Sequence, residues 1–148
     1  MTELALQVAA TLCRRFEGLY LTSYLCPAGV ATIGFGATYY QDGRRVTLAD
    51  PLITRAQAEA LLLWMLQTKY LPEVLRLCPG ITCPMRLAAI IDFTYNLGSG
   101  QLRGSNLRRR INSGDWAAVP GELAKWVKGG GRTLSGLVKR RAAEAILI

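Results

Sequence analysis

The run at residues 85–97, MRLAAIIDFTYNL, constrains the fold more than any other stretch of the sequence. Apolar side chains occupy almost the whole circumference of a helix with this sequence, and Pro84 suits its first turn. A helix that is apolar all round is buried at the centre of a domain. Its main polar residues, Asp92 and Asn96, lie one turn apart on one face. The other elements must therefore pack around this helix.

The length and composition predict one folded domain. The chain has 148 residues, of which 51% are hydrophobic and 19% are charged. This length suits a single hydrophobic core, and the composition is that of a globular protein rather than a disordered one. We expect an α+β, mainly α fold in one domain over residues 1–148, with a small β-rich lobe at about 18–50. The larger helical lobe then comprises residues 1–17 and 51–148.

The β-rich lobe is predicted to be a small antiparallel sheet. Residues 20–25 alternate loosely in polarity, and residues 30–35 are β-branched and flanked by glycine. The sequence QDG at 41–43 predicts a hairpin-type turn, so residues 45–47 are expected to return as a third strand.

Helices are predicted on both sides of this lobe. The first, near the N-terminus, has apolar side chains at helical spacing on one face. The sequence TRAQ at 54–57 is a capping box that opens a long helix through about residue 77. Pro72 is expected to kink that helix or to split it in two. The apolar face of the N-terminal helix is predicted to consist of Leu4, Val8, Leu12 and Phe16.

The C-terminal third contains two further predicted helices. Asp115 suits the N-cap of a helix over residues 115–127, which Pro120 should distort. The three glycines at 129–131 are predicted to be the most flexible point of this region. Ser135 is expected to cap a final helix that ends near Leu147.

The net charge of +8 favours anionic partners. Nucleic acid, anionic lipid and anionic cell-wall polymer all fit, while the basic run at 108–110 also fits a solvated helix face. Residues 1–12 carry Glu3, lack a basic leading segment and are shorter than the roughly 20 apolar residues of a membrane span. We therefore expect no signal peptide, no anchor and no stable membrane insertion in this chain, which either stays in the cytoplasm until it is released or has lost a targeting segment.

Four cysteines and no histidine limit the metal chemistry. Cys78 and Cys83 flank the sequence PGIT, which fits either a local disulfide across a tight turn or two reduced thiols at helix ends. Cys13 and Cys26 stand apart from this pair. A zinc site needs four ligands with matched spacing, so we expect no metal and no cofactor.

The stretch at residues 16–38 holds three potentially reactive side chains close together. Glu17 closes the first predicted helix, and burial there would make it a general acid, although alone it fits a solvated carboxylate or the partner of an arginine better. Cys26 precedes a proline in a predicted turn, which is more exposed than a core strand. Thr32 by itself is an ordinary strand residue.

The spacing of Glu17, Cys26 and Thr32, together with the turn TIGFG at 32–36, resembles the catalytic stretch of phage-type lysozymes. These are the endolysins of glycoside hydrolase family 24. Downstream blocks resemble the lambdoid branch of that family in the same order. They are DFTYNLG at 92–98, LRRRINSGDW at 107–116, WVKGGG at 126–131 and GLVKRRAAE at 136–144.

The resemblance implies a lysozyme-like fold and hydrolysis of the β-1,4 bond between N-acetylmuramic acid and N-acetylglucosamine in peptidoglycan. Glu17 would protonate the leaving oxygen, because cleavage needs a proton donor on one face of the sugar and a base or nucleophile on the other. Cys26 falls where most members have a second carboxylate. Thr32 falls where a hydroxyl holds the attacking water or the sugar.

Further positions receive roles from the same resemblance. Asn96 matches an amide that faces the cleft and fits either recognition of a sugar N-acetyl group or a helix cap. Gly34 and Gly36 are expected beside the substrate. Arg140 and Arg141 resemble the basic pair from which the family draws an ion-pair partner for the catalytic Glu.

Two residues depart from the common pattern of the family. Cys26 replaces Asp, and a thiol needs nearby positive charge to act as a base at neutral pH. In members with Cys here, its oxidation into a disulfide keeps the enzyme inactive, and Cys13 is the nearest partner in sequence. Ala37 stands where many relatives have His, which affects packing or substrate fit more than chemistry.

Three functions are therefore compared. A muramidase that lyses bacterial walls ranks first. We expect it to be synthesised in the host cytoplasm and to act as a monomer on peptidoglycan in the periplasm. The sequence indicates no export route. A non-catalytic wall-binding or scaffolding module on a degenerate lysozyme fold ranks second, because Asp is replaced by Cys. A nucleic-acid-binding protein ranks last, since its basic residues are scattered.

Overall fold

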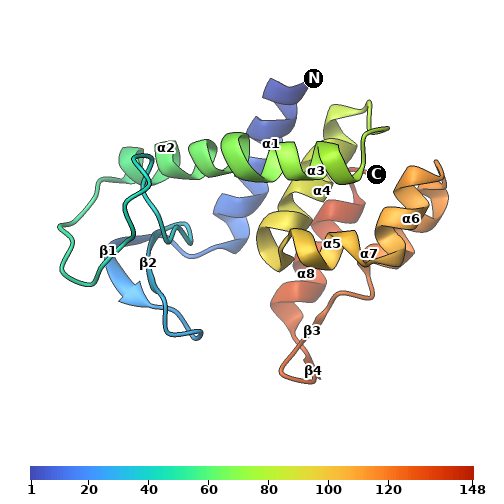
Figure 1. The fold of residues 1–148 in the computed structure, drawn as a ribbon. Coiled ribbons are helices and arrows are strands. Elements are labelled where there is room, and N and C mark those ends of the chain that lie inside the picture. Colours follow the sequence, from blue (N-terminus) through green and yellow to red (C-terminus); the bar gives the residue numbers. More distant parts are fainter.

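The computed structural model describes residues 1–148 and shows a mainly helical α+β fold with two small antiparallel sheets (Figure 1). The predicted central helix is α4 (Pro84–Leu97), and every residue from 87 to 94 is buried. α1 (Thr2–Phe16) and α8 (Ser135–Ala145) pack against it. The apolar circumference of α4 thus places it inside the main core, as the sequence predicts.

α1 buries a different face from the one predicted. Ala5, Ala9 and Cys13 are buried, whereas Leu4 is 49% exposed. Small side chains let the backbone of α1 approach α4 closely, and this contact selects the alanine face over the larger apolar residues. Of the predicted face, Leu12 alone is buried.

The β-rich lobe contains a two-stranded sheet of β1 (Tyr20–Leu25) and β2 (Ala31–Gly34), in which Tyr24 lies opposite Thr32. The predicted third strand at 45–47 is wrong. Only an isolated bridge joins Tyr39 to Arg45. The reason is local: the Thr47 N–H donates to the Asp50 carboxylate at 2.9 Å, which turns the chain away from the sheet.

The predicted long helix is split into three segments: α2 (Arg55–Met65), a π-helical turn η1 (Leu66–Tyr70) and α3 (Leu71–Leu77). The capping box at its start is confirmed, because Thr54 accepts from the Gln57 N–H while the Gln57 side chain accepts from the Thr54 N–H. Pro72 lies in the first turn of α3, where its missing N–H is tolerated. Figure 1 shows α2 running from the β-rich lobe toward the helical lobe.

The helix predicted over residues 115–127 is shorter than expected. The chain forms a 3₁₀ turn, η2 (Trp116–Ala118), and then α7 (Val119–Leu123), with Pro120 in its first turn. The glycines at 129–131 make the tip of a hairpin between β3 (Lys128–Gly129) and β4 (Arg132–Thr133). Positive φ angles at Gly130 and Gly131 allow this tight turn, so the glycines form a defined structure.

Two short helices complete the helical lobe: α5 (Ser99–Arg103) and α6 (Asn106–Asn112). The Ser105 hydroxyl accepts from the Arg108 N–H and caps α6. A smaller apolar cluster, distinct from the main core, joins the β-rich lobe to α2 and consists of Ile33, Ala37, Val46 and Leu61. No helix combines the length and the apolar character that a membrane span requires.

Candidate active site

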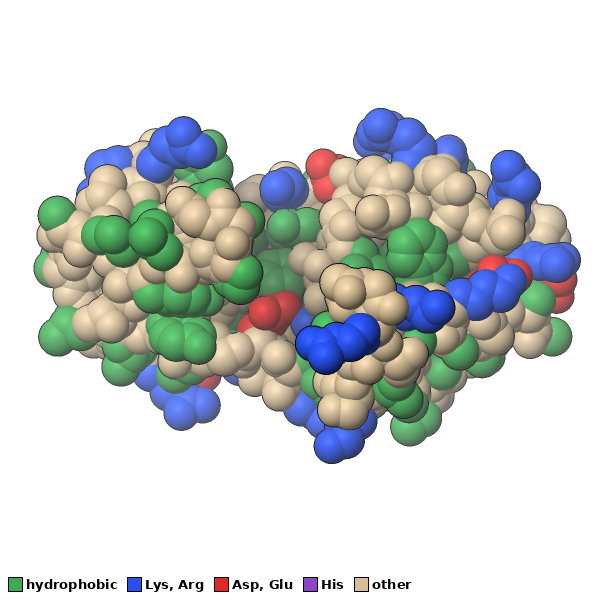
Figure 2. Space-filling view, turned by 90° about the horizontal axis from the view of Figure 1, so that it is seen from below, with side chains coloured by type: hydrophobic (Ala, Val, Ile, Leu, Met, Phe, Trp, Pro, Cys, Tyr) green, Lys and Arg blue, Asp and Glu red, His purple; other side chains and the backbone are tan.

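A hollow separates the two lobes, and acidic side-chain atoms lie within it (Figure 2). Beside Glu17, residues of the helical lobe line a pocket of about 400 Å³. Glu17 is the one carboxylate in its lining, so it is the natural proton donor or acceptor there. The lining residues are Phe16, Glu17, Asn96, Leu134, Gly136, Leu137 and Arg140.

Glu17 is positioned by the end of α1. Its N–H donates to the Cys13 carbonyl at 2.8 Å, and its own backbone is extended, so the chain leaves the helix at this residue. The side chain is 27% exposed, which leaves it accessible from the pocket. Its Oε1 accepts a hydrogen bond from Nη1 of Arg140 at 2.7 Å.

Arg140 joins Glu17 to a second carboxylate, Asp92. The Arg140 Nε donates to Asp92 Oδ2 at 2.9 Å, and Nη2 donates to Asp92 Oδ1 at 2.8 Å. The Cys13 thiol donates to the same Oδ1 at 3.3 Å. Asp92 and Arg140 are both buried, and burial of unpaired charges would be costly, so each requires the other.

Asp92 is the site residue to which sequence reasoning gave no role. Its position in an otherwise apolar helix could have indicated a role, because a buried carboxylate requires a cationic partner. The partner lies 48 positions away in the sequence, so the pair could not be identified without the fold.

The two arginines of the predicted basic pair bind different partners. Arg140 makes the ion pair with Glu17, whereas Nη2 of Arg141 donates to Asn96 Oδ1 at 2.8 Å and to Glu144 Oε1 at 2.7 Å. Glu144 is fully buried, and burial is the main reason that its pKa is raised, with nearby Asp92 adding to the effect. Arg141 therefore supports Asn96 rather than Glu17.

Cys26 and Thr32 lie together at the far end of the β1–β2 sheet. Gly29 N–H donates to the Cys26 carbonyl at 2.8 Å, which closes the turn between the strands. The pKa of the Cys26 thiol is lowered, chiefly by a backbone hydrogen bond from Val30, with a further backbone hydrogen bond from Ala28. Thr32 is buried on β2 and donates its hydroxyl hydrogen to the Val30 carbonyl at 2.9 Å.

Gly34 and Gly36 shape the turn after β2. Gly34 is buried with φ +67°, and a Cβ at this position would contact Ala58 of α2. Gly36 has φ +99° and is exposed, in the lining of a second hollow of about 330 Å³ together with Tyr39 and Trp64. The Tyr95 hydroxyl donates to the Phe35 carbonyl and ties this turn to α4.

All four cysteines are free thiols in the structure. Cys78 is buried and Cys83 is partly exposed. Cys13 is buried against Asp92, while Cys26 is partly exposed. No group of three or more His, Cys, Asp or Glu side chains is arranged to hold a metal ion.

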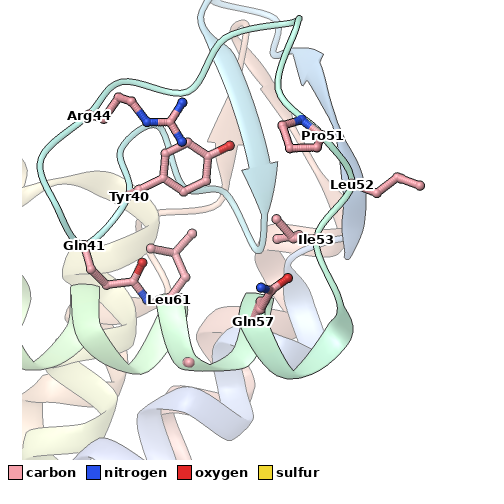
Figure 3. Close-up of a pocket in the computed structure, with 9 residues that line it drawn as sticks. Tyr40, Gln41, Arg44, Pro51, Leu52, Ile53, Gln57 and Leu61 are labelled. Atoms are coloured by element: carbon pink, nitrogen blue, oxygen red, sulfur yellow. The ribbon is translucent and has the colours of Figure 1, made fainter.

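A pocket of about 360 Å³ on the β-rich lobe is distinct from this site (Figure 3). It lies between α2 and the loop after β2, and its lining contains no carboxylate. Beside it, Asp50 accepts hydrogen bonds from Tyr40, Arg44 and Thr47. Because these groups satisfy one another, they shape the loop and leave no reactive group facing the pocket.

Comparisons with known proteins identify the family of the chain. The phage lysozyme family model matches residues 14–144. An endolysin of Acyrthosiphon pisum secondary endosymbiont phage 1 is 35% identical over 143 residues, covering 92% of this chain and 91% of that protein. A SAR-endolysin of Enterobacteria phage P21 is 33% identical, over 86% of this chain and 74% of that protein. The chain spans about half the length of endolysins from Bacillus phages B103 and PZA.

Solved structures show the same fold. An endolysin from Escherichia coli O157:H7 phage FAHEc1 superposes with a TM-score of 0.83 at 30% identity, covering 95% of this chain and 90% of that one. The muramidase domain of SpmX from Asticaccaulis excentricus gives 0.79 at 27% identity, with 95% and 94% covered. The family match covers most of the chain. The chain therefore belongs to the phage lysozyme family, whose members are muramidases that hydrolyse the peptidoglycan of the bacterial wall.

Proposed function

We propose that the chain cleaves the β-1,4 bond between N-acetylmuramic acid and N-acetylglucosamine, with Glu17 as the general acid. The observation that carries this proposal is the position of Glu17, the one carboxylate in the lining of a pocket at the end of α1, with one oxygen held by Arg140. Glu17 donates a proton to the glycosidic oxygen while the bond from the anomeric carbon to that oxygen breaks. A positioned general acid typically contributes about 10²- to 10⁴-fold in rate.

Cys26 and Thr32 are proposed to supply the second half of the reaction. The hydrogen bonds that lower the Cys26 pKa increase the fraction of thiolate, which is the reactive form. The thiolate then takes a proton from water as the water oxygen bonds to the anomeric carbon. The hydrogen of the Thr32 hydroxyl is donated to Val30, so its oxygen remains an acceptor that orients the water.

Asn96 is proposed to bind the sugar through its amide N–H₂ group. Its Oδ1 already accepts from Arg141, so the side chain lines the pocket with a donor left for the substrate. An amide donor fits the carbonyl oxygen of an N-acetyl group. Gly36 is proposed to border the glycan path, whereas Gly34 is buried and supports the turn through its contact with Ala58.

The site of action is proposed to be the periplasmic face of the wall, after synthesis in the host cytoplasm. Similarity to proteins named SAR-endolysins supports an exported enzyme. We propose that the chain acts there as a monomer.

The test is the Glu17→Gln variant. It should lower the release of reducing sugar from purified peptidoglycan by about 10²-fold or more, because the amide has no proton to donate at neutral pH. Circular dichroism and thermal unfolding should show a folded protein. Glu3→Gln makes the same change of charge at an exposed residue of α1 and should retain full activity.

Two outcomes would contradict the proposal. Wild-type activity in Glu17→Gln would remove Glu17 from the reaction. A wild-type protein that sediments with walls but releases no sugar would instead be a wall-binding module.

A further inference from the structure

We propose that Asp92 is a positioning residue of this active site, which holds Arg140 in the orientation that pairs with Glu17 and offsets the charge of Arg140 at the catalytic carboxyl. This inference rests on the proposed role of Glu17 as the acid. Asp92 itself lies behind Arg140 and is fully buried, so it acts through the arginine and does not touch the sugar.

The geometry of the guanidinium carries the first part of the proposal. Arg140 uses Nε and Nη2, which form one edge of the planar group, for the two oxygens of Asp92 at 2.9 and 2.8 Å. Nη1 is then left for Glu17 at 2.7 Å. Because the nitrogens form a rigid fork, binding one edge to Asp92 sets the direction in which Nη1 points.

Asp92 is itself held firmly. It lies in the middle of α4, where every neighbouring position from 87 to 94 is buried. The Cys13 thiol of α1 donates to Oδ1, the oxygen that also receives Nη2 of Arg140. Three helices thus meet at one carboxylate, and Arg140 has little freedom to turn toward solvent.

The charges of Arg140 and Asp92 support the second part of the proposal, that Asp92 offsets the effect of Arg140 on Glu17. An arginine next to a carboxyl favours its ionised form, whereas a general acid must keep its proton until the sugar is bound. Arg140 alone would therefore oppose the role of Glu17. Asp92 supplies a compensating negative charge at 2.8 Å from the same guanidinium, and in a buried site this compensation is only weakly screened.

Other ionisable groups around this cluster also respond to a change at Asp92. Glu144 matters most, because burial raises its pKa and Asp92 adds to that rise. Removal of Asp92 would therefore let Glu144 ionise beside Arg141, so Glu144 must be tested separately. The groups that face Asp92, Arg140 or Glu17 are Cys13 of α1, Tyr24 of β1, Tyr70 of η1, Tyr95 of α4, and Arg141 and Glu144 of α8.

The experiment is the pH profile of kcat/KM for peptidoglycan hydrolysis by Asp92→Asn. Its alkaline limb, which reports loss of the proton from the general acid, should move to lower pH by about one unit, since Arg140 is no longer compensated. Thr94→Val is the matched control. Thr94 is also buried in α4, but its hydroxyl bonds only to the Ile90 carbonyl, so the variant should lose stability and keep the wild-type alkaline limb.

A double variant keeps the proposal testable if Asp92→Asn does not fold. Asp92→Asn with Arg140→Gln removes both charges, which is far less destabilising than leaving one buried charge unpaired. If Asp92 offsets Arg140, the alkaline limb of this variant stays near that of the wild type. A rise of about one pH unit would show that Arg140 acts uncompensated, and would overturn the proposal.

Glu144 and Glu17 variants separate the remaining explanations. Adding Glu144→Gln to Asp92→Asn should preserve the downward shift, and its disappearance would assign the effect to Glu144. An unshifted alkaline limb in Asp92→Asn, together with an inactive Glu17→Gln, overturns this inference alone. Full activity in Glu17→Gln overturns both this inference and the proposed function.

Discussion

At the residue scale, the protonation state of Cys26 limits the proposed attack of water on the anomeric carbon. Most relatives are expected to carry a carboxylate there, which is ionised at any pH near neutrality, whereas a thiol is not. Backbone hydrogen bonds from the turn after β1, that from Val30 first, lower the Cys26 pKa below its ordinary value of 9.0. The fold thus increases the thiolate fraction without any cationic side chain in the turn.

Cys26→Asp should therefore change the pH dependence and retain the reaction. In the wild type, the step at Cys26 needs the thiolate, whose fraction rises with pH. An Asp ionises near pH 4, so the acidic limb of kcat/KM should move to lower pH in Cys26→Asp. Cys26→Ser should lower activity by about 10²-fold, because a hydroxyl does not ionise in this range.

Cys83 offers a matched control for these variants. Its thiol is also partly exposed, and its pKa is also lowered, chiefly by a backbone hydrogen bond from Arg86 at the start of α4. It is the N-cap residue of α4 and is not part of the β-rich lobe that contains Cys26 and Thr32. Cys83→Ser should therefore leave the profile unchanged, and wild-type lysis by Cys26→Ser would show that the Cys26 thiol takes no part.

At the element scale, the β3–β4 hairpin supports one wall of the pocket. Leu134 follows β4 and lines the pocket together with Leu137 of α8. Its side chain lies over Gly129, where an added Cβ would come within 2.5 Å of Leu134 Cδ1. The absence of a side chain at Gly129 thus allows Leu134 to take the position that shapes this wall.

Gly129→Ala should weaken substrate binding more than the chemical step. The methyl group forces the Leu134 side chain to rotate, and a shift of this size in a pocket wall changes discrimination by about tenfold. Steady-state kinetics on soluble peptidoglycan fragments should show KM raised and kcat nearly constant. Gly121→Ala in α7 meets no atom within 4 Å and serves as the control. An unchanged KM in Gly129→Ala would exclude this role of the hairpin.

At the scale of the whole molecule, the net charge of +8 acts on the approach to the wall. A positive protein is attracted to an anionic polymer over a distance set by the ionic strength. The screening length falls from about 30 Å at 0.01 M salt to about 8 Å at 0.15 M. Attraction to the wall should therefore depend on salt more strongly than the chemistry at Glu17 does.

The inactive Glu17→Gln variant allows this attraction to be measured without hydrolysis. The fraction that sediments with purified walls should fall severalfold between about 0.01 M and 0.15 M sodium chloride. Sucrose at matched osmolarity should leave binding unchanged. Binding that does not respond to salt would indicate recognition by uncharged contacts alone.

The sequence by itself determined the elements whose causes are local. The apolar circumference of α4 required burial, the Thr54–Gln57 capping box started α2, and the β-branched run predicted β2. The order of Glu17, Cys26 and Thr32 also lies within one short stretch. Each of these depends on side chains only a few positions apart, so neighbouring residues carry the information.

The tertiary structure decided which side chains meet across long separations. The alanine face of α1 was selected by its contact with α4, and pairing near residue 45 was limited to one bridge with Tyr39. Arg140 meets Glu17 across 123 positions and Asp92 across 48. Such pairings follow from how three helices pack, because a buried charge is satisfied by whichever partner the packing brings within reach.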